Sequence, residues 1–135
     1  MKITFILPAI GKKKKKKYIG TWKMEPLTIA VLKSLTPKNI ETELFDDRIE
    51  LIDYNTQTDL VCITVESYTA KRSYKIAEKF RERGIPVVMG GYHVTLCPEE
   101  AVNYCNSVIV GNAETVWNDV LNDFQSGNLK KIYQG

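Results

Sequence analysis

The 135-residue sequence has a single histidine, His93, and no two cysteines with the CxxC spacing of a zinc or thiol-redox site. Its three cysteines are an odd set, which argues against a disulfide framework. Cys62, inside the apolar run LVCITV, is expected to be a small core residue. No apolar stretch approaches the roughly 20 residues of a membrane helix. P-loop, GxGxxG, HExxH and nucleophile-elbow patterns are also absent, so no common catalytic motif is present.

Basic residues slightly outnumber acidic ones, and the net charge of +3 arises from a single segment. The run Lys12–Lys17 contributes six positive charges, which is more than the net charge of the whole chain, so the rest of the chain is net acidic. Like charges repel and nothing apolar anchors this run, so we expect a disordered loop that trypsin cuts first. No aromatic residue interleaves it, so no nucleic-acid partner is expected. Because the lysines stand where a signal peptide would have its cleavage site, we expect a cytoplasmic protein with no membrane partner.

The length and the 44% hydrophobic content predict one domain over residues 1–135. Continuous apolar runs are typical of buried parallel strands, whereas the alternation in IETELFD, residues 40–46, predicts a half-buried strand near a sheet edge. KKIYQG is a candidate short final strand. The expected strands cover residues 2–7, 40–46, 59–65, 85–91 and 107–111.

Four segments with helical periodicity alternate with these strands. One stripe of the helix at 26–35 carries Leu27, Ala30, Val31 and Leu35. The helix at 69–84 is expected to turn Tyr74, Ala77 and Phe80 inward, and the helix at 113–127 to turn Val116, Val120, Leu121 and Phe124 inward. A short helix is expected at 98–105, after a polar loop. This rhythm predicts an α/β fold, a flavodoxin-like (Rossmann-type) doubly wound parallel sheet of about five strands in the order 2-1-3-4-5.

Ligands of such sheets bind beyond the carboxyl ends of the strands, where the strand order switches. Small residues gather at these ends, most clearly Gly90-Gly91 and Thr64, and would leave a slot over the sheet edge. Ordinary turn chemistry also explains a glycine after a strand. A phosphoacceptor receiver domain is excluded, because Pro8, Thr64 and Gly111 stand where it needs acidic or lysine residues. A flavin mononucleotide site would need a Ser/Thr-rich loop after the first strand.

The order of several motifs resembles the N-terminal cobalamin (B12)-binding domain of B12-dependent radical S-adenosylmethionine proteins. The most specific part is GG-x-H-x-T-x-x-P-E-E-A at Gly90–Ala101, followed by V-x-V-G-x-x-E at Val108–Glu114. The D-x-H-x-x-G element of methionine-synthase-like B12 domains is absent, and GNAE stands where the family usually has G-E-x-E. The C-x-x-x-C-x-x-C motif of the radical barrel is also absent. The resemblance implies a cobalamin-binding domain without catalysis of its own, with the radical SAM barrel in cis holding S-adenosylmethionine and the 4Fe-4S cluster downstream.

Carried over by position, the resemblance implies that the nucleotide tail of cobalamin lies in a slot at Gly90-Gly91, beside Thr64, with the corrin ring over the strand ends. A Gly91→Val change should then fill the slot and leave the fold intact. His93 is expected to bond polar groups rather than cobalt, because a loop offers a ligand little support. The alternatives are a docking module of the same fold that has lost its cofactor and a flavin-binding electron carrier. The expected cofactor-binding residues are Pro8, Ala9, Ile10, Thr64, Val65, Glu66, Ser67, Tyr68, Gly90, Gly91, Tyr92, His93, Gly111 and Glu114.

Overall fold

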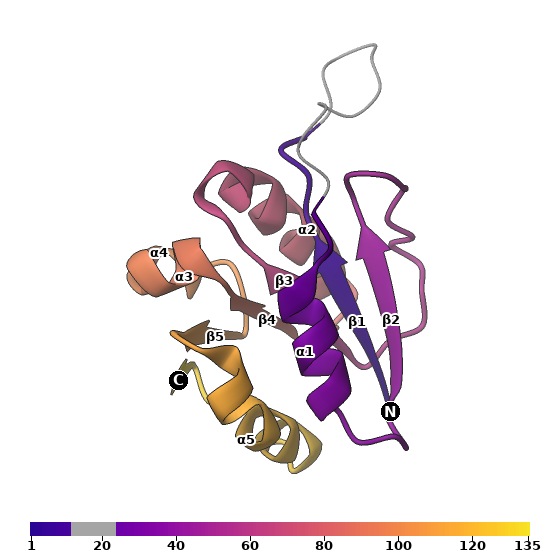
Figure 1. Cartoon of the computed structure of the whole chain (residues 1–135), viewed down its shortest axis with the longest axis vertical. Coiled ribbons are helices and arrows are strands. Elements are labelled where there is room, and N and C mark those ends of the chain that lie inside the picture. The colour runs from indigo at the N-terminus through magenta and orange to yellow at the C-terminus, as the bar shows by residue number, and fades with distance from the viewer. Residues whose placement is uncertain (12–23) are drawn as a thin grey trace.

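A computed structural model describes residues 1–11 and 24–135, and the disorder predicted for Lys12–Lys17 lies outside the described residues. The fold is built on one parallel sheet with the strand order β2-β1-β3-β4-β5-β6 (Figure 1). This confirms the flavodoxin-like α/β prediction, with the candidate final strand as a sixth member. The strands are β1 (Lys2–Leu7), β2 (Glu41–Asp46), β3 (Leu60–Thr64), β4 (Val87–Gly90), β5 (Ser107–Val110) and β6 (Ile132–Gln134).

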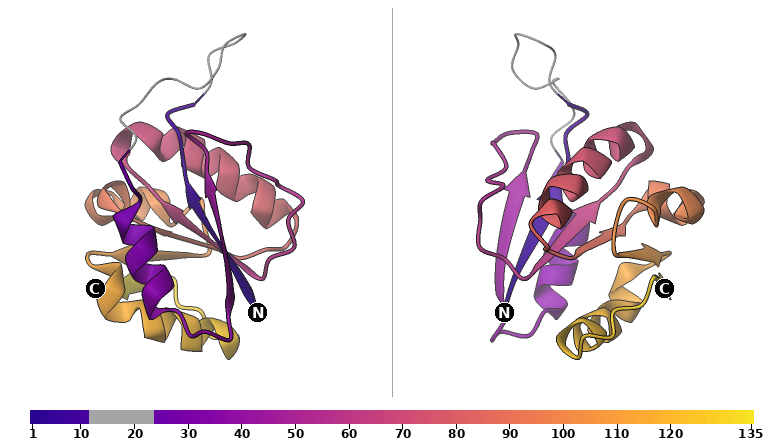
Figure 2. Two further views of the ribbon diagram at one scale, coloured as in Figure 1. Left: turned by 45° about the vertical axis from the view of Figure 1, so that its right-hand side comes forward. Right: turned by 180° about the vertical axis from the view of Figure 1, so that it is seen from behind.

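Helices cover both faces of the sheet, as a doubly wound fold requires (Figure 2). One face carries α1 (Leu27–Leu35) and α5 (Ala113–Gln125), which contact each other. The other carries α2 (Ala70–Glu82) and the short helices α3 (Tyr92–Leu96) and α4 (Pro98–Ala101). A 3-10 turn, η1 (Ser67–Thr69), leads from β3 into α2. We call these the α1/α5 face and the α2/α3 face.

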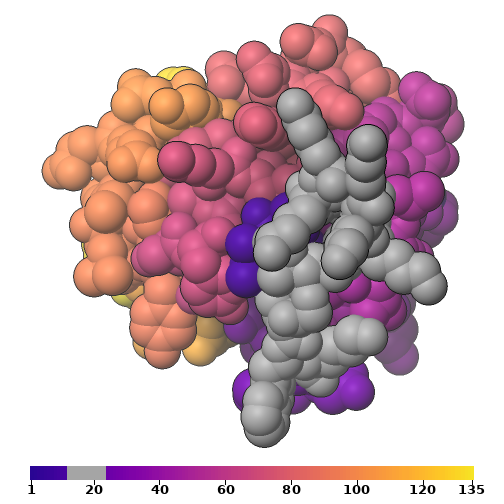
Figure 3. Space-filling view, turned by 90° about the horizontal axis from the view of Figure 1, so that it is seen from above, coloured from indigo at the N-terminus to yellow at the C-terminus, as the bar shows by residue number. Residues whose placement is uncertain are grey.

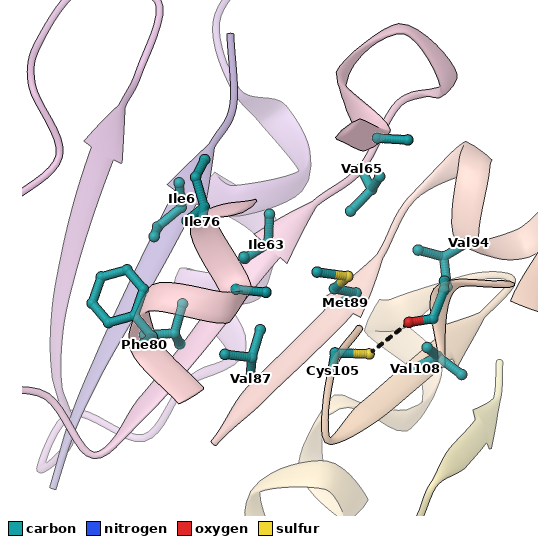
Figure 4. Packing of buried hydrophobic residues seen from close by; sticks show 14 of the residues in the cluster. Ile6, Ile63, Val65, Ile76, Phe80, Val87, Met89, Val94, Cys105 and Val108 are labelled. Carbon is teal, nitrogen blue, oxygen red and sulfur yellow. Dashed lines mark hydrogen bonds between the residues drawn. The ribbon is translucent and has the colours of Figure 1, made fainter. Parts of the chain in front are cut away.

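Each face of the sheet has its own hydrophobic cluster. On the α2/α3 face, Phe80 and Ile76 pack with Ile63 and Met89 of the central strands (Figure 4). On the α1/α5 face, the ring of Trp117 lies 5.8 Å from that of Phe5. The sheet therefore separates two packed layers.

Helix α1 faces the opposite way from the predicted stripe. Leu27, Val31 and Leu35 are 67%, 44% and 40% exposed, whereas Ile29 and Leu32 are buried. The helix is apolar nearly all round, so its hydrophobic periodicity fits two faces and does not select between them. The inward-facing residues predicted for the helices at 69–84 and 113–127 agree better with the structure. Phe80, Ala77, Val120 and Leu121 are buried, and Tyr74, Val116 and Phe124 are partly buried.

The polar loop expected after Gly90-Gly91 is instead a short helix, α3. Gly91 adopts a φ of 106° and stands at its N-cap, so the chain turns directly from strand into helix. The edge position predicted for the strand at 40–46 is confirmed, because among the described strands β2 pairs with β1 alone. Within the described ranges, no helix has both the length and the apolar character to cross a membrane.

Candidate ligand site at the carboxyl ends of the strands

A pocket of about 300 Å³ opens at the carboxyl ends of β1 and β3, where the strand order switches. Figure 3 looks onto these strand ends, and the indigo end of the first strand lies beside the rose residues that follow β3. This is where ligands of open α/β sheets bind. We call it the switch pocket, and its lining residues are Leu7, Pro8, Ala9, Ile10, Arg48, Thr64, Glu66, Tyr68 and Thr69.

One buried carboxylate fixes the loop that forms the β1 side of the switch pocket. Asp47, 1% exposed, accepts a hydrogen bond from the Ala9 N–H at 3.0 Å. The Arg72 guanidinium of α2 donates two more, at 2.9 and 2.8 Å. A bidentate pair of this kind is strong and geometrically specific. Asp47 therefore ties the end of β1 to α2 and holds Pro8–Ile10 in place.

Arg48 forms another wall of the switch pocket and is held by its own partner. Its Nε and Nη2 atoms donate to the two carboxylate oxygens of Asp46 at 2.9 and 2.7 Å. Nη2 also donates to the Met24 carbonyl at 2.9 Å. Because Asp46 offsets its charge, Arg48 adds a rigid planar wall more than a site for anions.

Glu66 is the acidic residue of the switch pocket. Thr69 closes the turn around it: the Thr69 hydroxyl accepts from the Glu66 N–H at 3.0 Å and donates to the Glu66 carbonyl at 3.1 Å. Partial burial raises the pKa of the Glu66 carboxyl above its ordinary value. The carboxyl group consequently takes up a proton more readily than a solvated glutamate.

A second, much narrower space lies between the sheet and helices α1 and α5. It has a volume of about 30 Å³, room for one or two water molecules. Thr64 lines both this space and the switch pocket. Burial raises the pKa of the Cys62 thiol, so the thiol is neutral there. We call this space the α1 slot, and it is lined by Phe5, Thr28, Leu32, Cys62, Ile63, Thr64, Val88, Gly90, Gly91, Ile109, Ala113 and Trp117.

The two glycines at the end of β4 play different parts. A Cβ atom on Gly90 would lie 3.8 Å from the nearest atoms, those of Ile109, which is an ordinary contact. A Cβ atom on Gly91 would lie 2.7 Å from the Val65 carbonyl oxygen and 2.9 Å from the Val65 nitrogen. Gly91 is therefore required by the protein's own backbone. The expectation that Gly91→Val leaves the fold intact is wrong, and Gly90 is the glycine that leaves space in the slot.

His93 lies on the α2/α3 face, across the sheet from the α1 slot. Its Nε2 atom is 3.0 Å from the Tyr74 hydroxyl and 3.3 Å from a Glu100 carboxylate oxygen, and the Tyr74 hydroxyl donates to that oxygen at 2.8 Å. These contacts lower the pKa of the Glu100 carboxyl, the Tyr74 hydrogen bond most strongly. Burial, followed by the Glu100 bond, raises the pKa of Tyr74. His93 thus ties α3 to α2 and α4. It lies on a helix with fixed hydrogen-bond partners, and not on the poorly supported loop that was expected.

The predicted site residues divide into three groups. Pro8, Ala9, Ile10, Thr64, Glu66 and Tyr68 meet in the switch pocket, and Thr64 joins Gly90 and Gly91 in the α1 slot. In the described part of the chain, the remaining residues line neither space. Gly111 packs on the end of the chain, where a Cβ atom would lie 2.5 Å from the Gly135 carbonyl oxygen. The others in this group are Val65, whose backbone contacts Gly91, the exposed Ser67, Tyr92 and Glu114, and His93.

Sequence reasoning missed several residues that shape the site. Asp47 and Arg48 directly follow β2, which neighbours the switch point. The acidic pair Asp46-Asp47 at the end of that strand was a signal for Asp47. Thr28 and Trp117 reach the slot from α1 and α5. Nothing in their local sequence separates them from other helix residues, since the packing of each helix decides which side faces the sheet.

Comparisons with known proteins find relatives among methyltransferases, although no protein-family model matches the sequence. The chain is 39% identical to bacteriochlorophyllide d C-8(2)-methyltransferase of Chlorobaculum tepidum and 32% identical to the C-12(1)-methyltransferase of that organism. The alignments cover 79% and 81% of this chain but only 24% of each enzyme. An uncharacterized methyltransferase of Pyrococcus horikoshii is 28% identical over 97% of this chain and 31% of that protein. The chain thus spans about a quarter of the length of the two bacteriochlorophyllide enzymes.

Among solved structures, the N-terminal domain of a hypothetical protein of Thermotoga maritima has the same fold. Its TM-score is 0.55 at 21% identity, and the match covers 87% of this chain and 99% of that domain. The sequence matches relate the chain to one part of longer methyltransferases, and the structural match supports the α/β architecture.

Proposed function

We propose that this chain is the cobalamin-binding domain of a B12-dependent radical SAM methyltransferase. The observation that carries the proposal is the adjacency of the switch pocket and the α1 slot, joined at Thr64, which pairs with the small residue Gly90 of β4. A flat ring with a long tail needs this combination of an open surface and a deep, narrow space. The methyltransferase relatives add the reaction class, and the motif resemblance adds the cofactor.

The chemistry of the lining suits such a ligand. Ile10 and Tyr68, both exposed, give the switch pocket an apolar surface for a ring, while the Glu66 carboxyl and the Thr64 hydroxyl can bond amide side chains. The Thr28 hydroxyl and the neutral Cys62 thiol line the slot. When bound, cobalamin supplies a cobalt centre that carries a methyl group. The residues of this chain bind and orient the cofactor.

The size of the α1 slot sets a condition on this function. At about 30 Å³, it is far too small for a nucleotide tail unless α1 moves away from the sheet. The same narrowness is what a docking module that has lost its cofactor would show. The choice between these two functions therefore depends on whether the slot opens to cobalamin.

Absorption spectroscopy separates the candidate functions. Purified protein is incubated with hydroxocobalamin or with flavin mononucleotide, desalted, and scanned. Retention of about one cobalamin per chain, with none of the flavin, supports the proposal. Retention of neither ligand would favour the docking module, and retention of flavin alone would favour an electron carrier.

The remaining parts of the proposal concern the longer protein. Residues 1–135 act as one binding domain, and a radical SAM barrel in the same polypeptide supplies S-adenosylmethionine and the 4Fe-4S cluster. The names of the relatives make a tetrapyrrole such as bacteriochlorophyllide the first substrate class to assay. We place the protein in the cytoplasm.

A further inference from the structure

The outer surface of α2 carries a regular row of positive charge. Lys71, Lys75, Lys79 and Arg83 follow one another at intervals of four residues, which places them on one side of the helix. All four are exposed. Like charges at this spacing destabilise a helix by about 0.2–0.5 kcal/mol per pair. Within residues 1–11 and 24–135, none of the three lysines forms an ion pair that would offset this cost.

The C-terminal half of the row, Lys79 and Arg83, already binds a segment of the chain. The Lys79 ammonium lies 4.2 Å from the centre of the Tyr54 ring, a cation–π contact. The Arg83 guanidinium donates to the carbonyls of Tyr54 and Thr56. This half of α2 thus uses its cations to hold residues 54–56 by an aromatic face and main-chain carbonyls.

The N-terminal half of the row, Lys71 and Lys75, borders a groove that the described residues leave open. The groove has a volume of about 500 Å³ and lies between α2 and residues 51–54. Its apolar side is formed by Ile52, which is buried, and by Leu51 and Ile10, which are 70% and 40% exposed. Lys71 and Lys75 line the groove from α2. We call this space the α2 groove.

The net charge of the α2 groove is positive. Arg72 also lines it, but its guanidinium is held by the buried Asp47, which offsets its charge. No carboxylate is among the described residues that line the groove. Lys71, Lys75 and Lys79 therefore present positive charge beside exposed aliphatic side chains.

We propose that the α2 groove binds an acidic, amphipathic peptide segment of a partner. Carboxylates about 6 Å apart on one side of that segment would pair with Lys71 and Lys75, and an apolar side chain next to them would cover Leu51 and Ile10. Opposite charge gives the interface its orientation, and the apolar contact adds burial. A concave groove fits a peptide segment better than a flat lipid surface. Among the described lining residues, the groove shares Ile10 alone with the switch pocket and none with the α1 slot, so the pairing at Lys71 and Lys75 does not require bound cobalamin.

The test uses the whole chain and a synthetic helical peptide with glutamates at every fourth position and leucines beside them. Binding is measured by calorimetry and by amide chemical shifts of labelled protein. Shifts should concentrate in residues 51–54 and 71–79. Lys71→Glu/Lys75→Glu should weaken binding by at least about tenfold, because two attractions become repulsions. Lys33→Glu/Lys38→Glu, which changes the net charge equally on the other side of the molecule, should bind like the parent.

Two further measurements separate this interaction from general attraction to anions. Leu51→Ser should weaken the peptide without changing the charge, and a peptide with serine in place of leucine should bind poorly to the parent. Equal losses in both lysine pairs would overturn the proposal, as would unchanged binding in Lys71→Glu/Lys75→Glu. Binding to anionic phosphatidylserine vesicles but not to the peptide would also overturn it and identify a membrane surface instead.

Discussion

The backbone of Gly91 lies against the backbone of Val65, so closely that a Cβ atom on Gly91 would come within 2.7 Å of the Val65 carbonyl oxygen. Two hydrogen bonds continue the contact: the Val65 N–H donates to the Gly90 carbonyl at 2.8 Å, and the His93 N–H donates to the Val65 carbonyl at 3.1 Å. The junction of β4 and α3 is therefore clamped onto the end of β3. This clamp positions the glycines that line the α1 slot.

Replacing Gly91 with alanine should destabilise the protein. The new Cβ atom meets backbone that cannot rotate away, and the φ of 106° is unfavourable for alanine. We expect a loss of about 3 kcal/mol in the free energy of unfolding, measured in urea. Gly127→Ala is the matched control, because Gly127 also has a positive φ, 75°, but nothing lies within 4 Å of its Cβ position. It should lose only about 1 kcal/mol, and equal losses would mean that the Val65 contact is unimportant.

Replacing Gly90 with valine should separate binding from folding. The Cβ atom of the valine would make only ordinary contacts, at 3.8 Å from Ile109, and Gly90 has no positive φ, so we expect stability within about 1 kcal/mol of the parent. Its side chain takes up space in the α1 slot, so the affinity for cobalamin should fall at least about tenfold. Equilibrium titration followed by absorbance measures the affinity, and urea unfolding measures the stability. Unchanged affinity in a folded Gly90→Val variant would show that the cofactor does not use this slot.

Removing the charge of Asp47 should cost much more than removing a surface carboxylate. Asp47→Asn leaves the partly buried Arg72 guanidinium without the counter-charge of the buried Asp47, and we expect a loss of about 3 kcal/mol. Asp123→Asn is the control, since Asp123 pairs with the exposed Lys130, and should lose at most about 1 kcal/mol. Arg72→Met combined with Asp47→Asn should recover part of the loss. Similar stability in the two single variants would argue against Asp47 as the anchor of the β1 loop.

Glu66 should make stability fall as the pH rises. Its carboxyl has a raised pKa in the folded state, so the folded protein holds the proton more tightly than the unfolded chain. The folded state is then favoured most below the ordinary value of 4.5, and this advantage is lost as the pH rises through the folded pKa. Glu66→Gln should therefore melt at a higher temperature than the parent at neutral pH, and the difference should shrink toward about pH 4. Glu66→Leu should behave alike, and a pH-independent difference would contradict the burial effect.

His93 should stabilise the α2/α3 face without binding cobalt. His93→Ala and Tyr74→Phe each remove the bond between the imidazole and the phenol, and we expect similar losses of about 1–2 kcal/mol. A double-mutant cycle should show coupling between them. In the Co(II) form of bound cobalamin, electron paramagnetic resonance should show no nitrogen splitting that depends on His93. Triplets that vanish in His93→Ala would reverse this assignment.

The sequence determines the fold more clearly than it determines the site. Buried parallel strands such as Leu60–Thr64 read as unbroken apolar runs, and the alternation at Glu41–Asp46 identified an edge strand, because both patterns follow directly from which faces are covered. Which side of α1 is buried could not be predicted in this way. Leu27 and Ile29 are equally apolar, and only the packing of α1 on the sheet turns Ile29 inward.

The site could be predicted only in part, for the same reason. The position of Thr64 at the switch point follows from strand order, so a pocket there could be predicted. Which glycine leaves space could not, because Gly90 and Gly91 differ only in the direction in which each would project a side chain. The environment of His93 depends on Tyr74 and Glu100, which come from two other helices. Contacts between distant segments of this kind leave no local pattern in the sequence.

The narrowness of the α1 slot has a kinetic consequence. A nucleotide-sized group can enter only after α1 has separated from the sheet, so entry has a first-order step that precedes contact. The observed association rate would then level off as the ligand concentration rises, at the rate of helix departure. Release has to cross the same barrier, which gives a bound ligand a long residence time even if its equilibrium affinity is moderate. A ligand that entered this slot would therefore dissociate slowly.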